Sequence, residues 1–172
     1  MIRFAGAMLV LLAGTLIGYA QAARFAARPR QIRQLIHALQ RLETEIQYGQ
    51  TPLPEALARL AGVVPEPVSG LFANIAGQLE QRAGPTVREI WERAIAGGWS
   101  RTAMKTPERE ALARLGATLG GSGREDQLKH VRLAMLQLQA EETAAREEQQ
   151  RYEKMSRSLG VLGAALVVIV LL

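Results

Sequence analysis

Few side chains in this sequence are able to carry chemistry. There is no cysteine, and the two histidines, His37 and His130, share the chain with a single aspartate, Asp126. The lack of cysteine removes disulfides, iron–sulfur clusters, cysteine zinc sites and thiol nucleophiles. Neither histidine has another histidine three or four residues away, the spacing at which a helix holds a metal ion. We therefore expect no catalytic residue, no metal and no cofactor, and so no enzyme.

Two further patterns are weak candidates for binding sites. The run Gly120-Gly121-Ser122-Gly123 is glycine-rich like a phosphate loop, but it follows a helical pattern and lacks the Gly-Lys-Ser/Thr ending. We interpret it as a turn. The net charge is +5, and only eight of 172 residues are aromatic. A charge excess this small and a chain so poor in stacking rings argue against binding to nucleic acid.

The apolar residues gather at the two ends of the chain. The run from Phe4 to Ala23 has no charged residue and, as a helix, would span about 30 Å, the thickness of a bilayer core. The run from Leu159 to Leu172 is shorter, about 21 Å as a helix. We predict a transmembrane helix over 1–23, a cytoplasmic helical domain over 24–157 and a transmembrane helix over 158–172. A re-entrant or buried amphipathic end is the alternative for the last segment.

A cleaved signal peptide is the alternative for the first segment. Ala20-Gln21-Ala22 fits the small-residue pattern of a cleavage site. However, the basic region before the apolar run is one residue, Arg3, and four arginines follow closely, where positive charge resists export. These features favour an uncleaved membrane anchor.

Basic residues flank both apolar segments on the side of the middle segment. Because positive charge stays on the cytoplasmic side, we expect the middle segment in the cytoplasm and both chain ends across the membrane. The flanking residues are Arg24, Arg28, Arg30, Arg33, Lys154 and Arg157. Small residues one helical turn apart would let the two membrane helices pack closely, although glycine is common in membrane helices in any case. They are Gly14, Gly18, Gly160 and Ala164.

The middle segment has helical periodicity throughout. From about Arg30, apolar residues recur at three- and four-residue steps, and turn residues divide the chain into further helices starting near Thr51, before Leu71, near Thr86 and at Thr106. The last helix starts near Arg124 and meets no proline or glycine before Gly160, so it should run into the terminal segment. We predict an all-α fold, a compact bundle of about six helices flanked by the two membrane helices.

Three stretches of the chain resemble signatures of one family. The first contains Arg28-Pro29-Arg30-Gln31-Ile32 and the segment from Leu42 to Leu57. The second contains Gly120, Arg124, Gln127, Lys129 and His130, and the third contains Arg151-Tyr152-Glu153-Lys154-Met155 with Ser158-Leu159-Gly160. In order and spacing they resemble the stage III sporulation protein AB family over essentially the whole chain.

The resemblance implies a role in endospore formation. The family sits in the mother-cell membrane and is similar to the cytoplasmic helical domain of the type II secretion platform F subunit. The resemblance implies that this chain is a non-enzymatic platform or scaffold subunit of a secretion-like channel complex between mother cell and forespore. The implied partners are other stage III sporulation A-operon proteins, including a secretion-type ATPase (protein AA) and polytopic membrane subunits. Association of the chain into an oligomer stays open. Signature residues expected to contact a partner are Tyr48, Thr51, Pro52, Arg124, Lys129 and His130.

Two other functions stay open from the sequence. One is a membrane-tethered coiled-coil assembly factor with no ATPase link, whose long last helix pairs with another helix. The other is an exported enzyme or binding protein released by signal cleavage.

Overall fold

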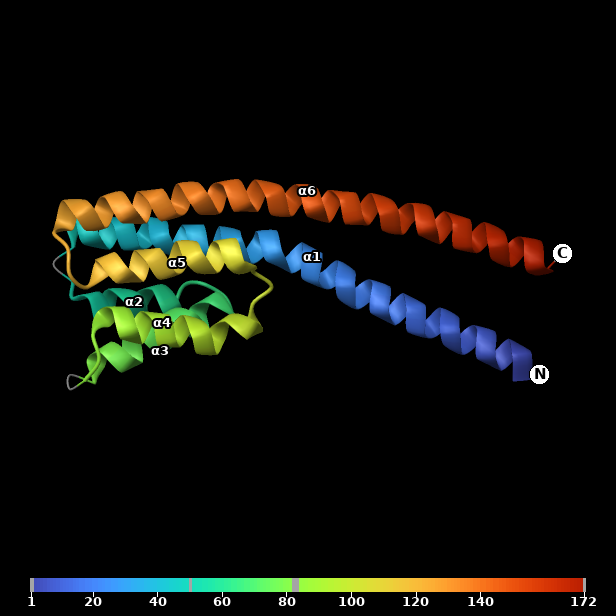
Figure 1. The fold of residues 1–172 in the computed structure, drawn as a ribbon, viewed down its shortest axis with the longest axis horizontal. Coiled ribbons are helices and arrows are strands. Elements are labelled where there is room, and N and C mark those ends of the chain that lie inside the picture. Colours follow the sequence, from blue (N-terminus) through green and yellow to red (C-terminus); the bar gives the residue numbers. More distant parts are fainter. Residues whose placement is uncertain (1, 50, 82–83, 172) are drawn as a thin grey trace.

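The structure, a computed structural model, is built from helices. It describes the backbone of residues 2–49, 51–81 and 84–171, and the side chains of residues 22–23, 25–49, 51–81 and 84–156. Within these ranges the chain forms six α-helices and one short 3-10 helix, which confirms the all-α prediction. Two long helices, α1 (Ile2–Tyr48) and α6 (Arg124–Leu171), lie along one side of the bundle, and four shorter helices lie against them (Figure 1).

The two long helices pack antiparallel. The start of α1 and the end of α6 therefore lie at the same end of the molecule (Figure 1). Their facing stripes are apolar at helical spacing: Ile32, Leu35 and Leu39 on α1 and Val131 and Leu138 on α6 are completely buried. Each such side chain contributes about 1.5–3 kcal/mol when it leaves water, so this seam holds the long helices together.

The four shorter helices complete the core. They are α2 (Leu53–Ala61), α3 (Val68–Glu80), α4 (Val87–Gly98) and α5 (Thr106–Leu119), and the 3-10 helix Trp99–Arg101 follows α4. Each packs on the next, and α5 packs on α6. Trp91 of α4 is completely buried and meets Phe72 of α3 edge-on, with 6.4 Å between ring centroids. Its Nε1 donates to the carbonyl of Leu112 at 2.8 Å, which satisfies the one polar atom of the indole.

The helices α2, α4 and α5 begin within one or two residues of the predicted positions. Thr86 caps α4 as the sequence predicts: its Oγ1 accepts the Glu89 N–H at 3.3 Å, and the Glu89 carboxylate accepts the Thr86 N–H. The helix α5 begins at Thr106 as predicted, but the residue in the cap position is Lys105 and not Thr106, because the Glu108 carboxylate accepts the Lys105 N–H at 2.7 Å. The helix α2 instead begins one residue later than a cap at Thr51 would give, with Pro52 at the cap position.

The first helix is longer than the sequence suggests. We predicted a new helix from about Arg30, but α1 runs unbroken from Ile2 to Tyr48 with Pro29 inside it. A proline within a helix costs about 3 kcal/mol. Pro29 is buried in the bundle, and the packing of α1 against α6 offsets this cost. The predicted continuity of the last helix into the terminal segment is confirmed for the α6 backbone.

The predicted membrane segments lie largely beyond the described side chains. Among the residues whose side chains are described, no helix has a stretch long and apolar enough to cross a bilayer. The side chains of residues 1–21 and 157–172 lie outside this set. The predicted helix-packing residues Gly14, Gly18, Gly160 and Ala164 fall there too.

Candidate functional site

A small cavity opens at the end of the bundle away from the two chain termini. It forms where α1 ends, α2 begins, α5 ends and α6 begins (Figure 1). We name it the end socket and define it by its lining: Leu42, Glu45, Ile46, Gly49, Thr51, Leu53, Ala56, Leu119, Arg124 and Gln127. The first signature supplies residues 42–56 and the second supplies Arg124 and Gln127, so two regions far apart in the sequence share this site.

The end socket has an apolar floor. Leu42, Ala56 and Leu119 are almost completely buried, with 0%, 3% and 4% of their surface exposed, while Ile46 and Leu53 are half-buried. The cavity measures about 240 Å³. That is larger than the ~150 Å³ apolar cavity known to admit a benzene ring. The socket therefore has room for one apolar side chain, which would contact mainly the half-buried Ile46 and Leu53 above this floor.

The polar rim of the socket is organised by Arg124. Its Nε donates to the carbonyl of Ile46 at 2.7 Å. That carbonyl lies in the last turn of α1, where helix carbonyls lack partners within the helix, and a cation there also complements the helix dipole. No carboxylate pairs with Arg124 among the described side chains, whereas Glu45 on the opposite rim lies 3.8 Å from Arg59. The exposed guanidinium group of Arg124 is therefore the charged group of the socket that lacks a charged partner among the described side chains.

The turn between α5 and α6 fixes where Arg124 stands. Gln127 donates from Nε2 to the carbonyls of Leu119 and Ser122, each at 3.0 Å, and so closes the turn. Gly120 allows the end of α5 to approach α4, because a Cβ there would lie 2.5 Å from the Cβ of Val87. The run of glycines thus serves as a turn with a close contact.

The structure brings some of the six predicted partner-contact residues together and separates others. Thr51 and Arg124 line the end socket. Tyr48, with 77% of its surface exposed, and Pro52 are their exposed neighbours along the chain. Lys129 and His130 lie further along α6 and do not line the socket; the His130 Nε2 is 3.6 Å from the Asp126 Oδ1.

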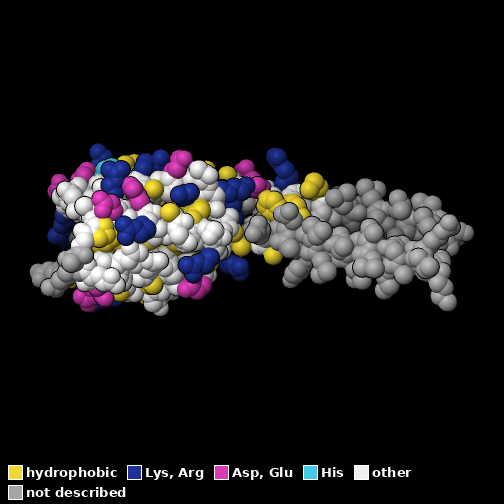
Figure 2. All heavy atoms as spheres, turned by 60° about the horizontal axis from the view of Figure 1, so that its bottom comes forward, with side chains coloured by type: hydrophobic (Ala, Val, Ile, Leu, Met, Phe, Trp, Pro, Cys, Tyr) yellow, Lys and Arg dark blue, Asp and Glu magenta, His cyan; other side chains and the backbone are white. Residues whose placement is uncertain are grey.

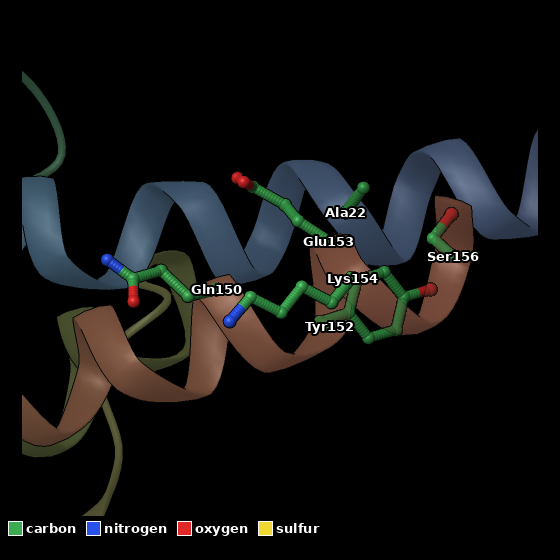
Figure 3. Close-up of a pocket in the computed structure, with 6 residues that line it drawn as sticks. All are labelled: Ala22, Gln150, Tyr152, Glu153, Lys154 and Ser156. Atoms are coloured by element: carbon green, nitrogen blue, oxygen red, sulfur yellow. The ribbon is translucent and has the colours of Figure 1, made fainter. Parts of the chain in front are cut away.

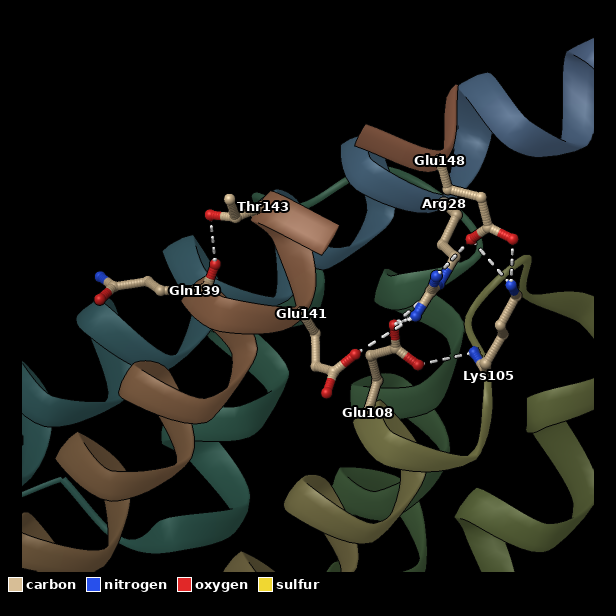
Figure 4. A network of polar contacts seen from close by, with 7 residues as sticks. All are labelled: Arg28, Lys105, Glu108, Gln139, Glu141, Thr143 and Glu148. Atoms are coloured by element: carbon tan, nitrogen blue, oxygen red, sulfur yellow. Dashed lines mark hydrogen bonds and ion pairs between the residues drawn. The ribbon is translucent and has the colours of Figure 1, made fainter. Parts of the chain in front are cut away.

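A second cluster involves Arg28, one of the predicted membrane-flanking residues. Its side chain is only 8% exposed and lies inside the bundle. The Nε and Nη2 atoms donate to Oε1 of the completely buried Glu108 at 2.9 and 2.6 Å, and Nη1 donates to Glu148 at 2.8 Å (Figure 4). Glu141 lies 3.4 Å from Nη2, and the Lys105 Nζ donates to Glu148 at 2.6 Å. This Arg28 cluster joins α1, α5 and α6.

The partners of Arg28 were not found from the sequence. Glu108 and Glu148 are 80 and 120 residues away. Each lies in a helical stretch rich in charged residues, so the local sequence does not indicate that it pairs with a buried arginine. The Lys105 ammonium, together with Arg28, holds the pKa of Glu148 below its usual value. Burial alone would raise the pKa of Glu142, but hydrogen bonds from Arg33 and Arg146 hold it below its ordinary value.

The other membrane-flanking residues have exposed or undescribed side chains. Arg30 and Arg33 are exposed on α1, and the Arg33 Nε donates to Glu142 of α6 at 2.8 Å. Lys154 is exposed on α6 and lines a cavity of about 480 Å³ with Ala22, Gln150, Tyr152, Glu153 and Ser156 (Figure 3). Phe25 stacks on Tyr152 beside it, with ring centroids 4.5 Å apart, which joins the two long helices. The side chains of Arg24 and Arg157 lie outside the described residues.

The described side chains include no metal-binding group, and their charges are mixed on the face drawn in Figure 2. No group of three or more His, Asp or Glu side chains in the described ranges is placed to hold a metal ion. On the exposed face of α1, the His37 Nδ1 lies 3.1 Å from the Gln40 Oε1, its one hydrogen-bond partner among the described residues. Figure 2 shows acidic and basic side chains interspersed over the face of the bundle drawn there, so that face has no field of a single sign.

Fold and site together define an all-α bundle with a small open cavity at one end. The family described as stage III sporulation protein AB matches residues 3–172. The stage III sporulation protein AB of Bacillus subtilis strain 168 is 39% identical over 172 residues, and the match covers 100% of both chains. This chain therefore belongs to the stage III sporulation protein AB family, and it is a sporulation-related protein.

A solved structure agrees with the fold. It is of stage III sporulation protein AB, is 41% identical in sequence and superposes with a TM-score of 0.68. The match covers 73% of this chain and 98% of the other.

Proposed function

We propose that this chain is a non-enzymatic platform subunit of the secretion-like channel complex that joins mother cell and forespore in endospore formation, and that it links a cytoplasmic ATPase to membrane partners. One observation carries the proposal. The antiparallel α1 and α6 take both chain ends to one end of the bundle, while the end socket lies at the other (Figure 1). A protein with two anchors at one end and an open contact surface at the other can bridge a membrane and a cytoplasmic protein.

The anchors are the predicted membrane segments 1–23 and 158–172. Both continue helices of the bundle, because α1 and α6 run through the boundaries without a break. Basic residues flank the segments on the bundle side, which favours a cytoplasmic bundle with both ends across the mother-cell membrane. The Phe25–Tyr152 pair lies within two turns of both segments, and aromatic rings are favoured at that depth because they suit the membrane–water interface.

The proposed partners are other stage III sporulation A-operon proteins, among them the secretion-type ATPase (protein AA) and the polytopic membrane subunits. Membership of the family and the resemblance to the secretion platform subunit support these partners. The coupling role is an analogy of fold and family, and so it needs its own test.

The test is a binding measurement with the full chain in phospholipid nanodiscs and the purified ATPase. We expect saturable binding and a change in ATP turnover when the chain is added. Empty nanodiscs control for binding of the ATPase to lipid. No binding, together with unchanged turnover, would exclude the link.

A tethered coiled-coil assembly factor is the second candidate, and the outer face of α6 favours it. Leu133 and Leu136 are 50% and 62% exposed there, with Lys129 and Ala140 continuing the heptad spacing. The double variant Leu133→Glu/Leu136→Glu separates the two functions. A platform whose ATPase contact is at the end socket keeps ATPase binding in this variant. An assembly factor shows no ATPase binding even in wild type, and loses a polytopic partner in the variant.

A further inference from the structure

We infer that the end socket receives one apolar side chain of the ATPase, and that a carboxylate beside that side chain pairs with Arg124. The inference rests on the proposed function and names the recognition chemistry of its contact. In this inference one segment of the partner supplies both groups: the apolar side chain enters the socket, and the neighbouring carboxylate pairs with Arg124.

The dimensions of the socket favour a single anchoring side chain. About 240 Å³ above a floor of Leu42, Ala56 and Leu119 suits one leucine, methionine or phenylalanine. A main chain lying across the opening would meet Thr51 and Gln127 at the rim, which both carry polar atoms. Pockets that hold one apolar anchor are typical of the centres of protein interfaces.

The charge at the rim selects an acidic neighbour. The Nε of Arg124 donates its hydrogen bond to the Ile46 carbonyl, and no described carboxylate pairs with the two Nη atoms of the guanidinium group. A guanidinium group binds a carboxylate through two parallel hydrogen bonds. Glu45, the other charged residue that lines the socket, lies 3.8 Å from Arg59, which also pairs with Glu55 at 2.7 Å. Arg124 is therefore the charged residue of the socket that is left to pair with a partner.

The position of the socket excludes a lipid as its occupant. It lies near residue 48 at the end of α1, whereas the predicted membrane segment ends near residue 23. At 1.5 Å per residue the intervening helix is about 36 Å long. The headgroup layer is only about 5–8 Å thick on each side of the bilayer, so a protein segment in the cytoplasm is the occupant.

Two variants test the inference through different parts of the socket. Ala56→Met fills the floor, and Arg124→Glu reverses the charge of the rim. We expect each to weaken the affinity of the nanodisc-embedded full chain for the ATPase by about tenfold or more. Arg93→Glu on the exposed face of α4 is the matched charge reversal, and its dissociation constant should stay within about twofold of wild type.

Circular dichroism melting of each variant separates a blocked socket from an unfolded bundle. Arg124→Glu keeps the test decisive if Ala56→Met disturbs the core, because the Arg124 side chain is exposed. If wild type binds and a folded variant of either kind binds equally well, the socket inference is wrong while the platform function stands. If wild type does not bind the ATPase at all, both are wrong.

Discussion

Replacing Arg28 with methionine is expected to destabilise the bundle by about 3–5 kcal/mol, because removing one partner of a buried ion pair leaves the other charge uncompensated. Glu108 is completely buried and receives two hydrogen bonds from Arg28, at 2.9 and 2.6 Å. Thermal and urea unfolding of the full chain, followed by circular dichroism, measures the loss.

Two further variants make the Arg28 prediction specific. Arg30→Met removes an exposed arginine two residues away and should unfold close to wild type. Adding Glu108→Met to Arg28→Met removes the unpaired carboxylate and should recover part of the lost stability, since an apolar pair of similar volume often replaces a buried ion pair without cost. The rest stays lost, because Glu108 also accepts the Lys105 N–H at the start of α5. An Arg28→Met chain as stable as Arg30→Met would show that the Arg28 cluster contributes nothing to folding.

Replacing Gly116 with alanine should cost about 1–3 kcal/mol of stability through overpacking. A Cβ at this position of α5 would lie 2.1 Å from Cδ1 of Trp91. The indole cannot retreat, because it is completely buried, bonded to the Leu112 carbonyl and packed against Phe72. The same unfolding experiment in the full chain measures the effect.

Gly77→Ala is the matched control for Gly116→Ala. Gly77 lies inside α3, and a Cβ there meets nothing within 4 Å. Alanine is a better helix former than glycine, so this change should stabilise the chain by up to about 1 kcal/mol. If the two substitutions shifted stability in the same direction, the close contact between Gly116 and Trp91 would not be what sets the size of residue 116.

Local patterns were sufficient to predict the helical elements. The helix α4 begins next to Thr86 as predicted, and the stretch without proline or glycine after Arg124 is a single helix. Two positions differ from the expected local pattern, one through tertiary packing and one through a local capping bond. Pro29 reads as a helix boundary but lies buried inside α1, and Thr106 reads as a cap but gives way to Glu108.

Residues of the candidate site could be named from the sequence, but their arrangement could not. Thr51 and Arg124 belong to recognisable signatures, yet the cavity between them exists only because four helices meet there. The bond from Arg124 to the Ile46 carbonyl spans 78 positions, and no local spacing predicts it. For Arg28 the sequence predicts a different environment from the one in the structure. Its place beside an apolar run predicts a membrane flank, while a glutamate 80 residues away accounts for its burial.

The platform function and the socket inference both depend on a bundle in the cytoplasm with the two chain ends across the membrane. Because the chain has no native cysteine, single cysteines at Ser100 or Leu172 report topology cleanly. The measurement is labelling by a membrane-impermeant maleimide, with each full-length variant expressed in the plasma membrane of intact vegetative cells. We predict that the cysteine at 172 is labelled from outside and the one at 100 only after the cells are opened. Labelling at 100 but not at 172 in intact cells would contradict the proposed topology.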